Sequence, residues 1–189
     1  MAKNIEVRIY QIKVTLQGVK PPVWRRLLVP GSISLRKLHD ILQVALGWTD
    51  SHLYLFEFQG QTYGVPDPDF ANDMRSDARV PLDQALVREK DAMIYEYDFG
   101  DGWRHKIVLE KIVHPTPETR VPLCIAGARA CPPEDCGGIW GYANLLEAIA
   151  DPSHPERAAM LEWLGDEFDP AHFSVEEVNA ILAPKRGRA

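Results

Sequence analysis

The sequence predicts an α+β fold, with a mixed or antiparallel sheet, one packed helix and a C-terminal helical segment. Alternating apolar and polar residues dominate from about residue 5 to 114 and indicate strands. Within that part, residues 35–46 instead carry apolar side chains at helical spacing. From about residue 137 to 183 the pattern is helical. The length suits one domain over residues 1–189.

Residues 5–16 and 23–29 predict the first two strands, joined by a turn at residues 18–22. The apolar parity of the first strand changes at Ile9 and Tyr10. One extra residue exchanges the two faces of a strand, so we expect a bulge or kink there.

The helix over residues 35–46 has clear end signals. Ser32 or Ser34 can cap its start, and Gly47 suits its end. An aromatic-rich strand over residues 52–58 follows. Hairpin, helix and strand in this order resemble a β-grasp unit.

A polar loop over residues 67–77 superficially resembles a calcium-binding loop. Ala71 and Asn72 stand where that loop needs an acidic ligand and a glycine, so we exclude calcium. A short helix is expected around residues 81–87.

A second hairpin is predicted from residues 93–98 and 103–113. Side-chain parity sets its register, because a shift by one residue would mix Glu96 with the aromatic residues. The predicted cross-strand pairs are Tyr97–Trp103, Tyr95–His105, Met93–Ile107, Glu96–Arg104 and Ile94–Lys106. One face of the hairpin is then almost wholly apolar.

The turn of this hairpin contains motif-like triplets. Residues 98–100 match the magnesium-binding triplet of protein kinases, but the chain lacks the other kinase motifs. Residues 100–102 lack the third glycine of a dinucleotide fingerprint. Asp98, Asp101 and His105 could bind a metal, although a histidine on an apolar strand face is typical of a core. We interpret the segment as a structural turn.

Three cysteines follow, at Cys124, Cys131 and Cys136, separated by six and four residues. Structural zinc sites usually hold pairs two to four residues apart. We therefore predict free thiols and no cofactor. Structural zinc is the alternative, with a fourth ligand such as His105 or His114.

The aromatic face of the second hairpin needs a cover, and the apolar residues between 125 and 142 are the nearest available. We predict that residues 132–142 pack near its turn and bring Glu134 and Asp135 towards Asp101 or Arg104. The candidate binding pocket then consists of Asp98, Asp101, Trp103, His105, Glu134, Asp135, Trp140 and Tyr142.

Three helices are predicted in the C-terminal part. The first carries an apolar stripe that includes Tyr142 and Leu145, and the second covers about residues 155–164. The third begins with a capping box formed by Ser174 and Glu177.

The net charge is −6 and the pI is near 5.5, which disfavours a phosphate-binding nucleic-acid protein. A basic run at residues 185–188 is interpreted as a solvated terminus. Charged residues interrupt the first nine positions, so we expect no signal peptide. No apolar stretch approaches the length needed to span a bilayer, so we expect no membrane association and a cytoplasmic location.

The chain resembles the plasmid pRiA4b ORF-3-like family, also seen as passenger proteins of bacterial insertion elements, from about Tyr10 to Leu182. The motifs that carry the resemblance are Pro21-Pro22-Val23-Trp24-Arg25-Arg26, Leu38-His39, Leu46-Gly47-Trp48, His52-Leu53-Tyr54, residues 97–105, residues 130–138 and Gly141-Tyr142. The resemblance implies an association with mobile elements and no particular chemistry.

These observations favour a non-catalytic binding or accessory protein with a protein partner. No catalytic residue is assigned. The alternative is a metal-dependent enzyme with its site between the 98–105 hairpin and the 131–142 segment. Its ligands would come from Asp98, Asp101, His105, Glu134 or Asp135.

Overall fold

The structure is a computed structural model that describes residues 8–66, 73–165 and 168–183. The expected strand start at residues 5–7, loop residues 67–72 and the basic run at 185–188 lie outside the described residues. The described part forms an eight-stranded sheet in the order β5-β4-β3-β6-β7-β1-β2-β8. All neighbouring pairs are antiparallel except β4 and β5. The predicted α+β class is confirmed.

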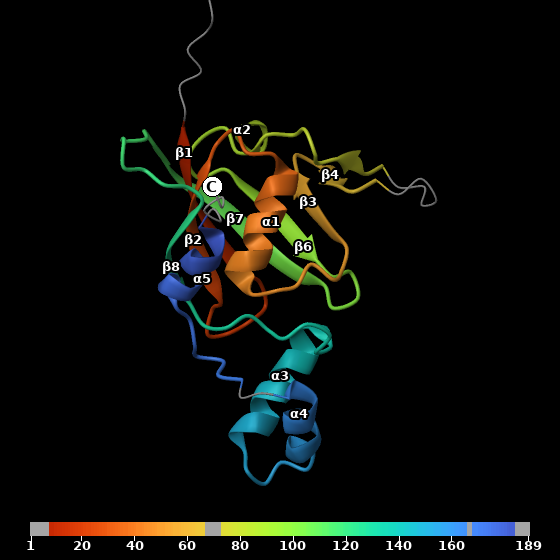
Figure 1. The fold of residues 1–189 in the computed structure, drawn as a ribbon. Coiled ribbons are helices and arrows are strands. Elements are labelled where there is room, and N and C mark those ends of the chain that lie inside the picture. The colour runs from red at the N-terminus through yellow and green to blue at the C-terminus, as the bar shows by residue number, and fades with distance from the viewer. Residues whose placement is uncertain (1–7, 67–72, 166–167, 184–189) are drawn as a thin grey trace, which may run out of the picture.

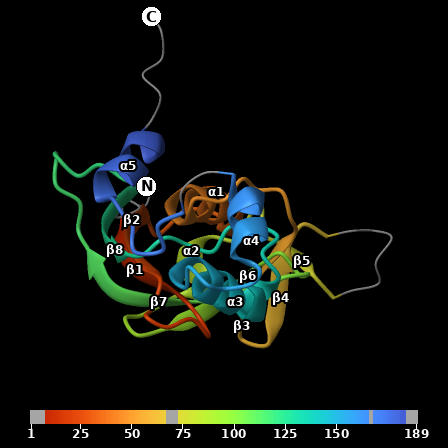
Figure 2. The same cartoon turned by 90° about the horizontal axis from the view of Figure 1, so that it is seen from below.

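The strands are β1 (Ile9–Leu16), β2 (Trp24–Pro30), β3 (Tyr54–Phe58), β4 (Gln61–Gly64), β5 (Arg75–Ser76), β6 (Ala92–Tyr97), β7 (Trp103–Val113) and β8 (Leu123–Ala128). The helices are α1 (Leu35–Leu46), α2 (Leu82–Ala85), α3 (Gly138–Ala150), α4 (Arg157–Leu164) and α5 (Val175–Leu182). Helix α1 lies across one face of the sheet, and α3 and α4 lie together beyond one end of it (Figure 1). Seen from below, these two helices are in front of the sheet (Figure 2).

The β-grasp-like unit is not confirmed. Strands β1 and β2 pair as the predicted hairpin, and α1 and β3 follow in the expected order. However, β6 and β7 lie between β1 and β3 in the sheet. The later hairpin therefore separates the first hairpin from β3.

The irregularity expected in the first strand lies on its neighbour. Strand β1 pairs with β2 without interruption, whereas its register against β7 shifts between Gln11 and Ile12. The shift leaves Glu110 as the additional residue of β7. Its carboxylate accepts hydrogen bonds from Arg26 (2.6 and 2.9 Å) and Gln11 (2.8 Å). The bulge thus directs the Glu110 side chain towards Arg26 on β2 and Gln11 on β1.

Helix α1 has the predicted ends. The Ser34 hydroxyl accepts a hydrogen bond from the Lys37 amide, and Gly47 ends the helix in the left-handed conformation with φ 83°. Its apolar stripe is buried against the sheet. Burial of this stripe fixes the rotation of the helix, and therefore the direction of the polar residues beside it.

The register predicted for the second hairpin is confirmed at every predicted pair. This face is buried: the apolar residues Met93, Tyr95, Tyr97, Trp103, Ile107 and Leu109 belong to the core, and the polar His105 is buried among them. On the opposite face, Arg104 forms ion pairs with Glu96 and Glu57. Alternation of buried and solvated side chains was sufficient to set this register.

The cover of this hairpin differs from the prediction. Instead of the residues between 125 and 142, α1 and Trp48 lie on the aromatic face. The Trp48 ring is 4.9 Å from the Tyr97 ring and 5.3 Å from the His105 ring, measured between centroids. The Trp48 indole N–H donates to the Pro132 carbonyl at 2.9 Å. The later segment therefore forms the layer outside Trp48.

The C-terminal part contains the three predicted helices and one strand, β8, that was not predicted. Strand β8 pairs with β2, and α5 packs against β8 and α1. The Asn179 side chain donates to the Cys124 carbonyl and accepts from the Cys124 amide, both at 2.7 Å. Ser174 caps α5 as predicted, but the Glu177 carboxylate bonds His172 at 2.9 Å.

Replacement of Trp103 tests the buried layer. Trp103 is fully buried, so Trp103→Ala should lower the free energy of unfolding by about 3–5 kcal/mol, as for other large buried aromatics. Trp140→Ala is the control, because that side chain is 87% exposed and its loss should cost less than about 0.5 kcal/mol. Urea unfolding followed by circular dichroism measures both. Equal stability of the two variants would contradict this packing.

Candidate functional site

Three segments meet at one end of the sheet: the loop after α1 (residues 47–53), the β6–β7 turn (98–102) and residues 131–138. The Gly137 amide donates to the Asp101 carboxylate at 3.3 Å. Gly138 has φ 66°, and a side chain there would lie 2.6 Å from the Asp101 carbonyl oxygen. The third segment can approach the turn this closely because it carries glycine at this point. The predicted proximity of these two segments is confirmed.

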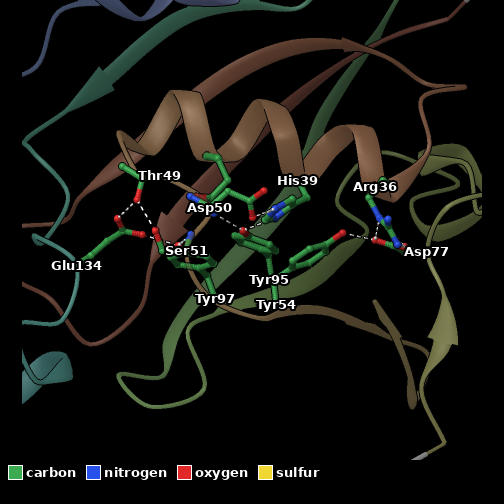
Figure 3. A network of polar contacts seen from close by, with 11 residues as sticks. Arg36, His39, Thr49, Asp50, Ser51, Tyr54, Asp77, Tyr95, Tyr97 and Glu134 are labelled. Carbon is green, nitrogen blue, oxygen red and sulfur yellow. Dashed lines mark hydrogen bonds and ion pairs between the residues drawn. The ribbon is translucent and has the colours of Figure 1, made fainter. Parts of the chain in front are cut away.

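A hydrogen-bonded clamp joins the three segments (Figure 3). The Tyr97 hydroxyl donates to the Glu134 carboxylate and accepts from the Ser51 amide at 3.0 Å. The Thr49 hydroxyl also donates to Glu134. Burial, followed by the Glu134 bond, raises the pKa of Tyr97. The phenol therefore stays protonated and donates to the carboxylate throughout the neutral range.

Next to the clamp, three side chains of metal-ligating type converge. The His52 Nε2 atom lies 3.3 Å from Asp135 Oδ1 and 3.7 Å from Asp98 Oδ2. Their ligand atoms all lie within 4.8 Å of one another, and within the described ranges no other His, Cys, Asp or Glu group of three does so. His52 Nε2 is a buried atom that makes no hydrogen bond. We call these three residues the triad.

The backbone of two triad residues is strained. Asp98 and Asp135 have φ of 57° and 60°, a region that residues with a side chain adopt at a cost. Asp98 Oδ1 accepts from the amides of Gly100 (2.9 Å) and Asp101 (3.3 Å), as in an Asx turn. This arrangement leaves Asp98 Oδ2 directed at His52.

A buried network continues under α1. The Tyr95 hydroxyl bonds His39 Nδ1 at 2.8 Å and accepts from Gln43 at 2.9 Å. His39 Nε2 lies 2.8 Å from the Asp50 carboxylate. Burial lowers the pKa of His39, and Asp50 partly offsets that effect. The loop after α1 is thereby attached to the helix itself.

The far end of the network is an ion pair around Asp77, whose side chain is fully buried. Arg36 binds its carboxylate in a bidentate manner, with contacts of 2.6 and 3.1 Å. The Tyr54 hydroxyl donates to the same carboxylate at 2.6 Å. Burial, then the bond to Asp77, raises the pKa of Tyr54. This end has a structural role, because every polar atom named here has a partner.

The structure separates the eight predicted pocket residues into two groups. We call the place where the three segments meet the seam. The predicted residues near it are Asp98, Asp101, Glu134 and Asp135. The other four do not line a shared pocket: Trp103 and His105 are fully buried, Tyr142 is buried on α3 and Trp140 is exposed. Trp103 and His105 cannot form a pocket wall at the seam because the Trp48 ring already covers them.

The position of Asp135 also corrects a prediction. The segment lies near Asp101 as predicted, but the Asp135 side chain pairs with His52, and neither acid lies towards Arg104. Arg104 projects from the opposite face of the sheet, where it pairs with Glu57 and Glu96.

The cysteines offer no reactive thiolate. Burial raises the pKa of all three, that of Cys131 to about 11 and that of Cys136 to about 12. Cys131 Sγ accepts a contact from the buried Arg25 guanidinium at 3.6 Å. The suggested ligands Cys124, Cys131, Cys136 and His105 do not converge as a group of three in the described part of the chain.

Sequence reasoning missed His52, Thr49 and Ser51 as residues of the seam. A local signal existed, since residues 49–52 form a short polar run between a helix end and a strand. Polar loops held by rigid elements often carry function. In the described helices, no segment is long and apolar enough to span a membrane.

Comparisons with known proteins agree with the fold. The family model for plasmid pRiA4b ORF-3-like proteins matches residues 8–177. The uncharacterized protein y4hQ of Sinorhizobium fredii is 41% identical over 177 residues, which are 92% of this chain and 90% of the relative. The crystal structure of a protein of unknown function from Methanosarcina mazei Go1 has 34% identity and a TM-score of 0.83. That match covers 90% of this chain and 97% of the other.

Acid should destabilise the protein through His105. Burial lowers the pKa of His105 from 6.5 to about 4. Between these values the unfolded chain binds a proton that the folded chain does not, so the free energy of unfolding falls as the pH decreases. The loss from pH 6.5 to 4 should reach about 3 kcal/mol.

Urea unfolding at a series of pH values measures this effect. His105→Gln should make the dependence shallower without abolishing it, because His39 acts in the same direction. The control His172→Ala removes an exposed histidine and should leave the pH 4 to 6.5 slope largely intact. An unchanged slope in His105→Gln would refute the assignment.

Proposed function

The chain belongs to the plasmid pRiA4b ORF-3-like family, and we propose that it is a non-catalytic binding or accessory protein of plasmids or mobile elements with a protein partner. The observation that carries the proposal is the apolar surface of the α3–α4 pair. Trp140 is 87% exposed, Trp163 50% and Leu161 38%. Exposed aromatic residues of this kind are typical of protein interfaces.

The surface also contains a hollow. A cavity of about 280 Å³ is lined by apolar residues that include Leu145, Met160 and Trp163, and also by Asp135 and Glu156. Every residue of α4 is at least partly exposed, so this helix contributes little to the core. An apolar side chain of a partner would fit such a hollow, and Trp163 would supply the aromatic contact.

The charge of the surface suggests the chemistry of the partner. Residues 138–165 contain Glu147, Asp151, Glu156 and Glu162 against a single Arg157. Complementary charge favours a partner segment that is basic as well as apolar. The same acidity disfavours a nucleic-acid backbone.

The state of the nucleophile candidates supports binding over catalysis. The cysteine thiols are protonated at neutral pH because burial raises the pKa of each. The Tyr95 and Tyr97 phenols have raised pKa values and are engaged in the network. His105 is fully buried and cannot meet a substrate.

A second candidate function, metal-dependent catalysis at the seam, is favoured by one observation. His52, Asp98 and Asp135 bring three ligand atoms together, and three protein ligands would leave a position open for a substrate. Turnover of this kind should disappear in His52→Ala and be unaffected by Trp140→Ala. The two candidate functions therefore give opposite results in these two variants.

The double variant Trp140→Ala/Trp163→Ala tests the partner surface. Cross-linking in the native host identifies the partner, and calorimetry with the two purified proteins measures the affinity. The double variant should weaken binding at least about tenfold, while its Tm stays within about 3 °C of the parent. Ile181→Ala is the control, since Ile181 is 69% exposed but lies on α5.

Unchanged affinity in the double variant would refute this surface. So would sedimentation showing that the protein is a dimer that the double variant converts to a monomer, since the face would then bind a second copy of the chain.

A further inference from the structure

We infer that the triad of His52, Asp98 and Asp135 is a binding site for one divalent transition-metal ion of the Zn²⁺ class. The site shares Asp135 with the hollow on the partner surface, but its other two residues lie outside that hollow. The inference rests on four observations: the spacing of the ligand atoms, their chemistry, a buried nitrogen without a hydrogen bond and the way the triad is held in place.

The spacing agrees with shared coordination. Ligand atoms about 2.0–2.2 Å from a tetrahedral ion lie about 3.3–3.6 Å from one another. His52 Nε2 lies 3.3 Å from Asp135 Oδ1 and 3.7 Å from Asp98 Oδ2. Both distances from His52 Nε2 are therefore close to those of a coordination sphere, and all three ligand atoms lie within 4.8 Å of one another.

The donor set selects a class of ion. One neutral imidazole and two carboxylates carry two negative charges, which match a divalent cation. Imidazole is a good ligand for zinc and other transition metals, whereas Mg²⁺ and Ca²⁺ are bound through oxygen. Three protein ligands would leave at least one coordination position for water.

The nitrogen that faces the two carboxylates lacks a hydrogen bond. His52 Nε2 is buried although the ring as a whole is partly exposed. The ring packs edge-on against Tyr97, with centroids 5.8 Å apart. The carboxylate oxygens of Asp135 and Asp98 lie 3.3 and 3.7 Å from it, at ion-pair distance but without the geometry of a hydrogen bond. A metal ion between this nitrogen and the carboxylates would give all three atoms a partner.

The clamp holds each triad residue through its neighbour in the chain. Ser51 precedes His52, Tyr97 precedes Asp98 and Glu134 precedes Asp135. Tyr97 bonds both Ser51 and Glu134, so one phenol connects the three segments just before the ligands. The clamp thus fixes the backbone beside each ligand, a role comparable to that of the outer hydrogen bonds that orient ligands in metal sites.

The strained backbone supports the same conclusion. Asp98 and Asp135 both adopt the left-handed conformation, with φ of 57° and 60°. Such strain persists where the surrounding structure enforces it, often at ligand sites. A surface ion pair between histidine and aspartate would need neither residue in this conformation.

Calorimetric titration of the full chain with Zn²⁺ tests the site. The protein is prepared without an affinity tag and treated with a chelator, and Mg²⁺ and Ca²⁺ are titrated for comparison. We expect one Zn²⁺ per chain and binding of Mg²⁺ and Ca²⁺ at least about tenfold weaker. His52→Ala, Asp98→Asn and Asp135→Asn should each weaken Zn²⁺ binding at least about tenfold.

The variants are chosen to preserve the fold. Asparagine tolerates the left-handed conformation and can still accept the Asx-turn bonds. His172→Ala is the matched control, since it removes a histidine paired with an acid elsewhere, and Cys136→Ser removes the neighbouring thiol. Both should retain binding. Absence of saturable binding, or full affinity in His52→Ala, would overturn the site, as would loss only in Cys136→Ser.

Glu134→Gln tests the positioning role of the clamp. The variant keeps all three ligands but replaces the charged acceptor of Tyr97 and Thr49. We expect Zn²⁺ affinity to fall about 10- to 100-fold, as for other residues that orient metal ligands. If Glu134 only stabilises the fold, the Tm of the metal-free protein will fall while the Zn²⁺ affinity of the folded protein stays unchanged.

Discussion

Three phenols buried in one layer constrain the rest of this structure. Tyr54 on β3 and Tyr95 and Tyr97 on β6 lie under α1 and its following loop. A buried hydroxyl without a partner costs about 1–3 kcal/mol, so each must find one. The Tyr95 hydroxyl is hydrogen-bonded to side chains of α1, that of Tyr54 to Asp77 and that of Tyr97 to Glu134. These needs connect segments that are distant in the sequence.

The seam is a consequence of the same requirement. The partner of Tyr97 comes from the segment after β8, so that segment must cross the end of the sheet near the β6–β7 turn. The loop after α1 reaches the same end of the sheet because two residues of α1, His39 and Gln43, bond Tyr95 on β6 and so fix the helix that precedes the loop. The hydrogen-bonding needs of the core thus place His52, Asp98 and Asp135 beside one another at the end of the sheet.

Local patterns predicted the parts of the fold that depend on local contacts. The register of β6 and β7 followed from side-chain parity across a short turn, and the ends of α1 followed from Ser34 and Gly47. Strand β8 and the Trp48 cover were not predicted, because both depend on pairing between distant segments. Asp98 and Asp135 were among the candidates as acids near glycines, whereas His52 joins them only through the tertiary fold.

The Asn179 side chain has a consequence for the behaviour of the sheet. A primary amide carries a donor and an acceptor in the same arrangement as a peptide group, and here it occupies both outward groups of Cys124 on β8. An unpaired strand edge is a template for intermolecular β-sheet growth. Helix α5 thereby blocks the β8 edge with one residue, and the opposite edge ends in the two-residue β5. Both edges of this wide sheet thus oppose the addition of a strand from another molecule.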